Sequence, residues 1–79
     1  MSPTVFKVNK FRFFFFSREE SRMHVHITCP DGEAKFWLEP VVALASSKKI
    51  STKVINDLQK IVEERQNEIK KAWKEHFRS

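Results

Sequence analysis

The spacing of apolar residues changes once along this 79-residue chain, and that change restricts the fold more than any other feature. From Val5 to Glu39 the apolar residues fall in the short, period-two runs that favour β-strands. From Ser51 to Phe77 they recur every three or four positions, which is the pattern of an amphipathic helix. Strands followed by a helix are typical of an α+β domain.

A first hairpin is predicted near the N-terminus. Asn9-Lys10 separates two segments rich in β-branched and aromatic residues, and Asn tolerates the positive φ of a tight turn. A two-residue turn there pairs Phe6 with Phe13 and Lys7 with Arg12. The side chains predicted to share the more polar face of this hairpin are Lys7, Arg12, Phe14 and Phe16.

A second hairpin is predicted at Asp31-Gly32, the strongest turn signal in the chain. Pairing outward from that turn places Cys29 opposite Ala34 and His26 opposite Trp37. One face of the hairpin is apolar and is expected to face the core: Val25, Ile27, Cys29, Ala34, Phe36 and Leu38. The other face is polar but carries a large aromatic ring: His24, His26, Thr28, Lys35, Trp37 and Glu39.

The rest of the chain predicts a connector and a long helix. Pro40 ends the last strand, and the apolar run Val41–Ala45 within the connector 40–50 predicts one or two helical turns. Ser51 is the expected N-cap of a helix over 51–78, which would be about 40 Å long at 1.5 Å per residue and would project or break at one end. The sequence therefore predicts one domain, 1–79, with a four-stranded antiparallel meander in 1–39 packed on a long C-terminal helix.

Composition restricts the partners and the compartment. The chain has 15 Lys+Arg and 10 Asp+Glu, and its net charge of +5 favours a phosphate-rich or acidic partner. The single cysteine excludes an intrachain disulfide and fits a reducing cytosol. No segment reaches the roughly 18 apolar residues of a membrane span, so we expect a cytoplasmic protein without a membrane partner. The single glycine excludes a Gly-rich phosphate loop.

The polar sheet face holds the candidate chemistry. His24 and His26 stand two positions apart on one strand, so their side chains point the same way, with Cα atoms about 6.5–7 Å apart. They could act as general acid and base on an RNA 2′-hydroxyl, in a ribonuclease-like reaction with Lys35 or Arg12 stabilising the phosphate charge. We assign His24, His26 and Lys35 as candidate catalytic residues.

Two alternatives for the histidines stay open. They could ligate a metal, but a zinc site requires three or four ligands, and Cys29 points to the other face. They could instead be polar strand residues that pack on Trp37. We expect no metal and no other cofactor.

Aromatic and basic side chains on the same face predict binding. Bases stack on aromatic rings and phosphates pair with cations on such surfaces, and the same composition suits a protein interface. An uncovered sheet face of this kind is also a candidate interface of a homodimer. The candidate binding residues are Lys7, Arg12, Trp37 and Glu39.

Four segments in combination resemble a known family. They are Pro3–Phe6 leading to Arg12–Phe15, His24-Val25-His26, Gly32–Pro40, and a helix ending in Ala72–Phe77. Together they resemble the DhiT toxins of bacterial type II toxin–antitoxin modules, within a family filed as a domain of unknown function. The resemblance implies a small cytoplasmic toxin with a DhiA-like antitoxin protein as its partner.

Two functions follow as expectations. The first is a toxin that acts on RNA or on the translation apparatus. The second is a non-enzymatic module that binds nucleic acid or protein through the same face.

Overall fold

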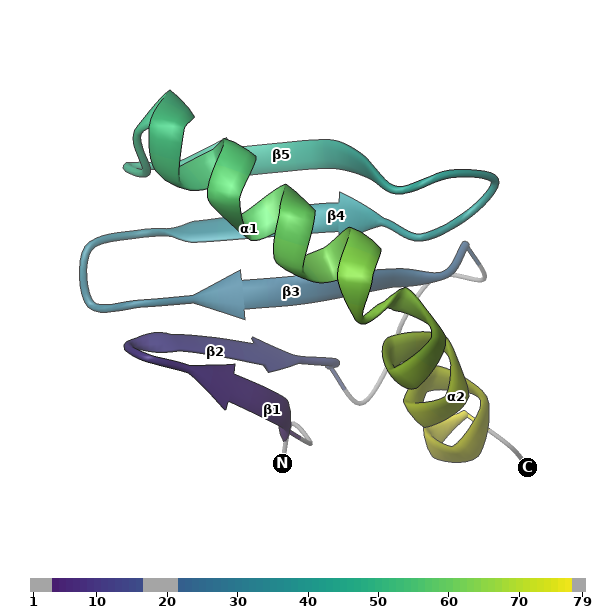
Figure 1. Ribbon diagram of the computed structural model, residues 1–79. Coiled ribbons are helices and arrows are strands. Elements are labelled where there is room, and N and C mark those ends of the chain that lie inside the picture. Colours follow the sequence, from purple (N-terminus) through teal and green to yellow (C-terminus); the bar gives the residue numbers. More distant parts are fainter. Residues whose placement is uncertain (1–3, 17–21, 78–79) are drawn as a thin grey trace.

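The computed structural model of the chain describes residues 4–16 and 22–77. Five antiparallel strands pair in chain order, and two helices follow them and lie on one side of the sheet (Figure 1). The predicted α+β class is confirmed. The elements are β1 (Thr4–Val8), β2 (Phe11–Phe14), β3 (His24–Thr28), β4 (Glu33–Trp37), β5 (Ala43–Lys48), α1 (Thr52–Glu64) and α2 (Gln66–His76).

The fifth strand corrects the prediction of four strands. Ala43–Lys48 forms β5 and pairs with β4, where the sequence had predicted helical turns within the connector 40–50. Exposure alternates from Ala43 to Ala45, which is the period of a strand. An apolar run this short cannot be assigned to strand or helix by periodicity, and pairing with β4 satisfies backbone groups that would otherwise lie on an open edge.

The single helix predicted over 51–78 is wrong, because Arg65 divides it in two. Arg65 has φ −110° and ψ 18°, ends α1 and precedes α2. Its guanidinium lies 3.6 Å from the centre of the Phe6 ring, and it donates hydrogen bonds to both Glu68 carboxylate oxygens at 3.0 and 3.1 Å. The break therefore falls in the polar gap of the apolar pattern, and it lets α2 change direction at the end of the sheet (Figure 1).

The core lies between the sheet and the helices. Its fully buried side chains come from alternate strand positions and from one stripe along both helices, as the two periodicities require. Burial of this apolar surface is the main term that stabilises the fold. The buried residues of the core are Phe13, Phe15, Met23, Val25, Ile27, Ala34, Phe36, Leu38, Ile55, Leu58, Val62, Ile69 and Trp73.

The first hairpin is confirmed and the second is shifted in register. Asn9 has the expected positive φ of 53°, and Lys7 pairs with Arg12. In the second hairpin the turn is Pro30-Asp31, closed by hydrogen bonds of 3.0 and 3.3 Å between the backbones of Cys29 and Gly32.

The shift moves each partner by two residues. His26 lies opposite Lys35 instead of Trp37, and His24 lies opposite Trp37. Because side chains alternate with a period of two, this shift leaves every residue on its predicted face.

The N-cap of α1 gives a first testable prediction. The Ser51 hydroxyl accepts a hydrogen bond of 3.3 Å from the Val54 backbone N–H, as expected for an N-cap. We expect Ser51→Ala to lower the free energy of unfolding by about 1 kcal/mol, measured by urea denaturation. Ser51→Asp is the matched control, because it keeps the acceptor and adds the acidic group that the first turn of α1 lacks. Equal losses in both variants would contradict a capping role.

Candidate functional site

The sheet face opposite α1, called the open face below, carries no helix among the described residues (Figure 1). Strand alternation brings polar and aromatic side chains of all five strands to this face. In strand order they include Lys7, Arg12, Phe14, His26, His24, Lys35, Trp37, Ser46 and Lys48.

Rings of the open face form one continuous series of contacts across three neighbouring strands. The Phe14 ring centre lies 5.2 Å from that of Phe16 and 5.6 Å from that of His26. His26 lies 4.4 Å from Phe16 and 4.9 Å from His24. His24 in turn lies 5.7 Å from Trp37. Four of these five contacts are edge-on, which is a favoured geometry of aromatic pairs, and the Phe14–His26 pair is tilted.

Cationic groups lie over the rings at both ends of this series. The Arg12 guanidinium lies 4.6 Å from the centre of Phe14. At the other end, Trp37 has the Arg22 guanidinium at 4.1 Å and the Lys35 ammonium at 4.5 Å. Energetically significant cation–π pairs occur about once per 70–80 residues in proteins. Three cation–ring contacts on one face of this small domain are therefore more than that average frequency predicts. The open face is therefore both basic and aromatic.

His24 differs from the rest of the open face because its side chain is fully buried. Its ring contacts Trp73 of α2 at 5.1 Å as well as Trp37 of β4. Nδ1 lies 2.7 Å from the Arg22 carbonyl oxygen, and because that oxygen can only accept, Nδ1 carries a proton. His24 thus joins the open face to α2, and its burial separates it from any ligand on that face.

A shallow depression lies beside His26, between β3 and β5. Its volume is about 330 Å³, and its rim includes Phe16, Lys35 and Lys48. This volume lies at the lower end of the range of small-ligand sites, about 300–1,000 Å³. The depression is thus large enough for one flat ring, beside the His26 imidazole, two ammonium groups and the Glu33 carboxylate.

The structure brings most of the predicted site residues together. Arg12, His26, Lys35 and Trp37 belong to the contact series just described. Lys7 is exposed on β1, the edge strand beyond Arg12.

The other two predicted site residues, Glu39 and His24, do not lie on the exposed part of the ring series. Glu39 is exposed beyond the end of β4, and its backbone carbonyl accepts a hydrogen bond of 3.1 Å from Arg22 Nε. His24 is interior to the site. The assignment of His24, His26 and Lys35 to catalysis, and with it ribonuclease-like activity, stays a prediction.

Sequence reasoning missed four residues of the open face, among them Glu33, which pairs with Thr28 because of the shifted register. Arg22 stands two positions before His24, so strand alternation continued backwards would have assigned it to this face. Ser46 and Lys48 were missed because their strand, β5, was not predicted.

Candidate metal ligands do not gather at this site. Within residues 4–16 and 22–77, no three His, Cys, Asp or Glu side chains lie close enough together to hold a metal ion. Cys29 is half-buried near the second turn, and its Sγ lies 3.5 Å from the Gly32 carbonyl oxygen. Over the same described ranges, neither helix has the length and apolar character needed to span a membrane.

Comparison with known families assigns the chain. Residues 10–74 match the domain of unknown function DUF4160, and the chain belongs to that family. The match supports no DhiT toxin family, so the resemblance drawn from the sequence motifs is wrong as an identification. The chain matches no curated protein and no solved structure.

The family match gives no support to the expected toxin. Growth inhibition and a neutralising antitoxin were implied by that resemblance, and both stay untested predictions without its support. What remains for a functional argument is the chemistry of the open face.

Proposed function

We propose that this protein binds single-stranded nucleic acid on the open face of its sheet, and that RNA is the preferred ligand. The observation that carries the proposal is the series of rings from Phe14 to Trp37 with a cation over each end. Proteins that bind single strands combine stacking platforms with cations that meet the phosphates, and this face has both. The net charge of +5 supports the same partner.

The stacked cations are compatible with a base-binding role. A guanidinium held flat against an aromatic ring presents its own outer plane, and bases stack on arginine planes as well as on rings. The Arg22 guanidinium lies 4.1 Å from the centre of Trp37 and the Arg12 guanidinium 4.6 Å from the centre of Phe14, within the range of cation–π contacts. The depression beside His26 adds a place for a base turned toward the sheet. Double-stranded RNA offers no unstacked base, so single strands are the expected ligand.

The second function class, a protein-binding surface, uses the same anchors but predicts a different response to salt. Phosphate contacts release counterions, so the logarithm of the affinity falls by about 0.7 per contact for each tenfold rise in salt. Binding that hardly responds to salt would favour a protein partner.

The test measures binding of a fluorescein-labelled 12-nucleotide single-stranded RNA of mixed sequence by fluorescence anisotropy. We expect wild type to bind it, and to bind the corresponding duplex more weakly. Trp37→Ala removes a stacking platform worth about 1–3 kcal/mol, so affinity should fall about 5- to 150-fold. Trp37→Phe keeps a ring and should retain most of the affinity.

The controls separate binding from folding and from general charge. Circular dichroism must show that each Trp37 variant is folded. Lys53→Gln/Lys60→Gln removes two exposed charges from α1 and should leave affinity close to that of wild type. Absence of wild-type binding at low salt, or a Trp37→Ala variant that binds like wild type, would refute the proposal.

A further inference from the structure

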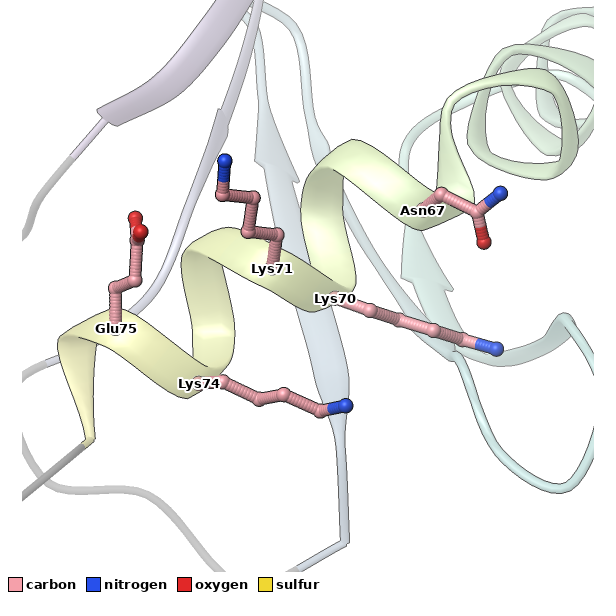
Figure 2. Close-up of a pocket in the computed structure, with 5 residues that line it drawn as sticks. All are labelled: Asn67, Lys70, Lys71, Lys74 and Glu75. Carbon is pink, nitrogen blue, oxygen red and sulfur yellow. The ribbon is translucent and has the colours of Figure 1, made fainter.

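A second basic surface lies on α2, the helix whose Trp73 ring contacts His24 at the end of the open face. Figure 2 shows Lys70 and Lys74 one helical turn apart and extending in the same direction, with Lys71 on the same helix. These three lysines, with Asn67 and Glu75, line a shallow groove of about 360 Å³ along the helix.

Core packing sets the positions of these lysines. Ile69 is fully buried and Trp73 is 8% exposed, and they fix the rotation of α2 about its axis. Each residue turns the helix by about 100°, so Lys70 and Lys74, which directly follow the buried pair, lie on the flank of the helix, where Lys70 is half-buried and Lys74 is exposed. Their orientation is thus a consequence of core packing.

The charge of this surface is unbalanced. Three cations elsewhere pair with carboxylates: Lys10 with Asp31 at 3.4 Å, Lys53 with Asp57 at 3.5 Å, and Arg65 with Glu68 at 3.0 Å. Within the described ranges, Lys70, Lys71 and Lys74 have no such partner, and the pair with Arg65 occupies Glu68, which leaves only Glu75 on α2. Like charges one turn apart repel, and an anion between Lys70 and Lys74 would relieve that repulsion.

The groove lies beside the end of the open face. Trp73, the residue before Lys74, contacts His24 at 5.1 Å, and His24 contacts Trp37 at 5.7 Å. A strand that stacks on Trp37 would therefore leave the sheet at the border with α2.

We propose that Lys70, Lys71 and Lys74 are a second phosphate-binding track, which holds the backbone of a single strand after it leaves the open face. This inference rests on the proposed function and adds the length and path of its ligand. The molecule is 37 Å long. At about 3.4 Å per nucleotide, a 12-mer extends about 40 Å, the length of the molecule, and can cover both surfaces, whereas a tetranucleotide of about 14 Å covers less than half of that length.

The test compares two variants of equal charge. Lys70→Gln/Lys74→Gln removes two lysines of the track, and Lys53→Gln/Lys60→Gln removes two from α1. Binding of the labelled 12-mer RNA is measured from 50 mM to 1 M salt. Two lost phosphate contacts should reduce the slope of log affinity against log salt by about 1.4. With equal affinities at 1 M, this slope corresponds to about tenfold weaker binding at 0.2 M salt.

Ligand length supplies the second readout. The α2 variant should bind a tetranucleotide, competed against the labelled 12-mer, as well as wild type does, because the tetranucleotide stays on the open face. A slope equal to that of the α1 variant would overturn the second track while leaving the proposed function intact. An equal loss for both lengths would overturn it too, since the lysines would then act on the open face. Failure of wild type to bind RNA at all refutes the proposed function instead.

Discussion

Gly32→Ala should destabilise this protein by about 2–3 kcal/mol, although Gly32 sits in a surface turn and has an ordinary φ. The reason is a close approach of two backbones. A Cβ built on Gly32 would lie 2.2 Å from the Lys48 carbonyl oxygen, 2.7 Å from the Lys49 carbonyl oxygen and 2.9 Å from the Lys49 carbonyl carbon. All three atoms are main chain, so the end of β5 must move away from the hairpin to admit a methyl group.

Thermal unfolding checks this expectation. A loss of this size lowers the Tm of a domain of 60–100 residues by about 10–20 °C. Asp31→Ala is the matched control, because Asp31 is exposed in the same turn and loses only a surface ion pair with Lys10, worth about 0.5 kcal/mol. Equal Tm values for the two variants would show that the end of β5 moves aside at little cost.

Trp73→Ala should have the largest effect on stability of the substitutions considered. The Trp73 ring packs against Phe15 at 5.3 Å, His24 at 5.1 Å and Phe77 at 4.3 Å, and so joins α2 to the sheet. Truncation of a buried Trp costs about 3–5 kcal/mol. A domain of this size has a total stability of about 4–12 kcal/mol, so the variant should be marginal at 37 °C.

Urea denaturation measures the loss, and a conservative variant shows its origin. Trp73→Phe keeps a ring against Phe15 and should lose much less stability than the alanine variant. It also leaves Trp37 as the only tryptophan, so its fluorescence reports on the open face alone. A loss below 1 kcal/mol in Trp73→Ala would mean that α2 contributes little to the fold.

Local patterns were enough to predict the strand-then-helix order, the first hairpin and the faces of the second. Asn9 adopts the positive φ that its residue type tolerates, and Ser51 caps the helix. The register of the second hairpin was wrong because Gly32 has two possible roles. Its position after Asp31 suggests a turn glycine, but it is needed where the end of β5 approaches, and no pattern in the hairpin itself shows that contact.

The candidate site was predictable to the extent that it depends on alternation. His26, Lys35, Trp37 and Arg12 lie on one face because strand side chains alternate. The burial of His24 depends on Trp73, which is 49 positions further along the chain, and only the packing of α2 creates that contact. Long-range packing of this kind leaves no trace in local spacing.

The order of the elements also determines when the apolar side of the sheet is covered. Every strand lies within residues 4–48, and both helices come after residue 51. Synthesis proceeds from the N-terminus at about 5–20 residues per second, so the five strands emerge first, with the Phe13, Ile27 and Phe36 side of the sheet exposed to solvent. For some seconds the nascent chain thus exposes an apolar surface that can aggregate. Binding of cellular chaperones during that interval would increase the fraction of chains that fold.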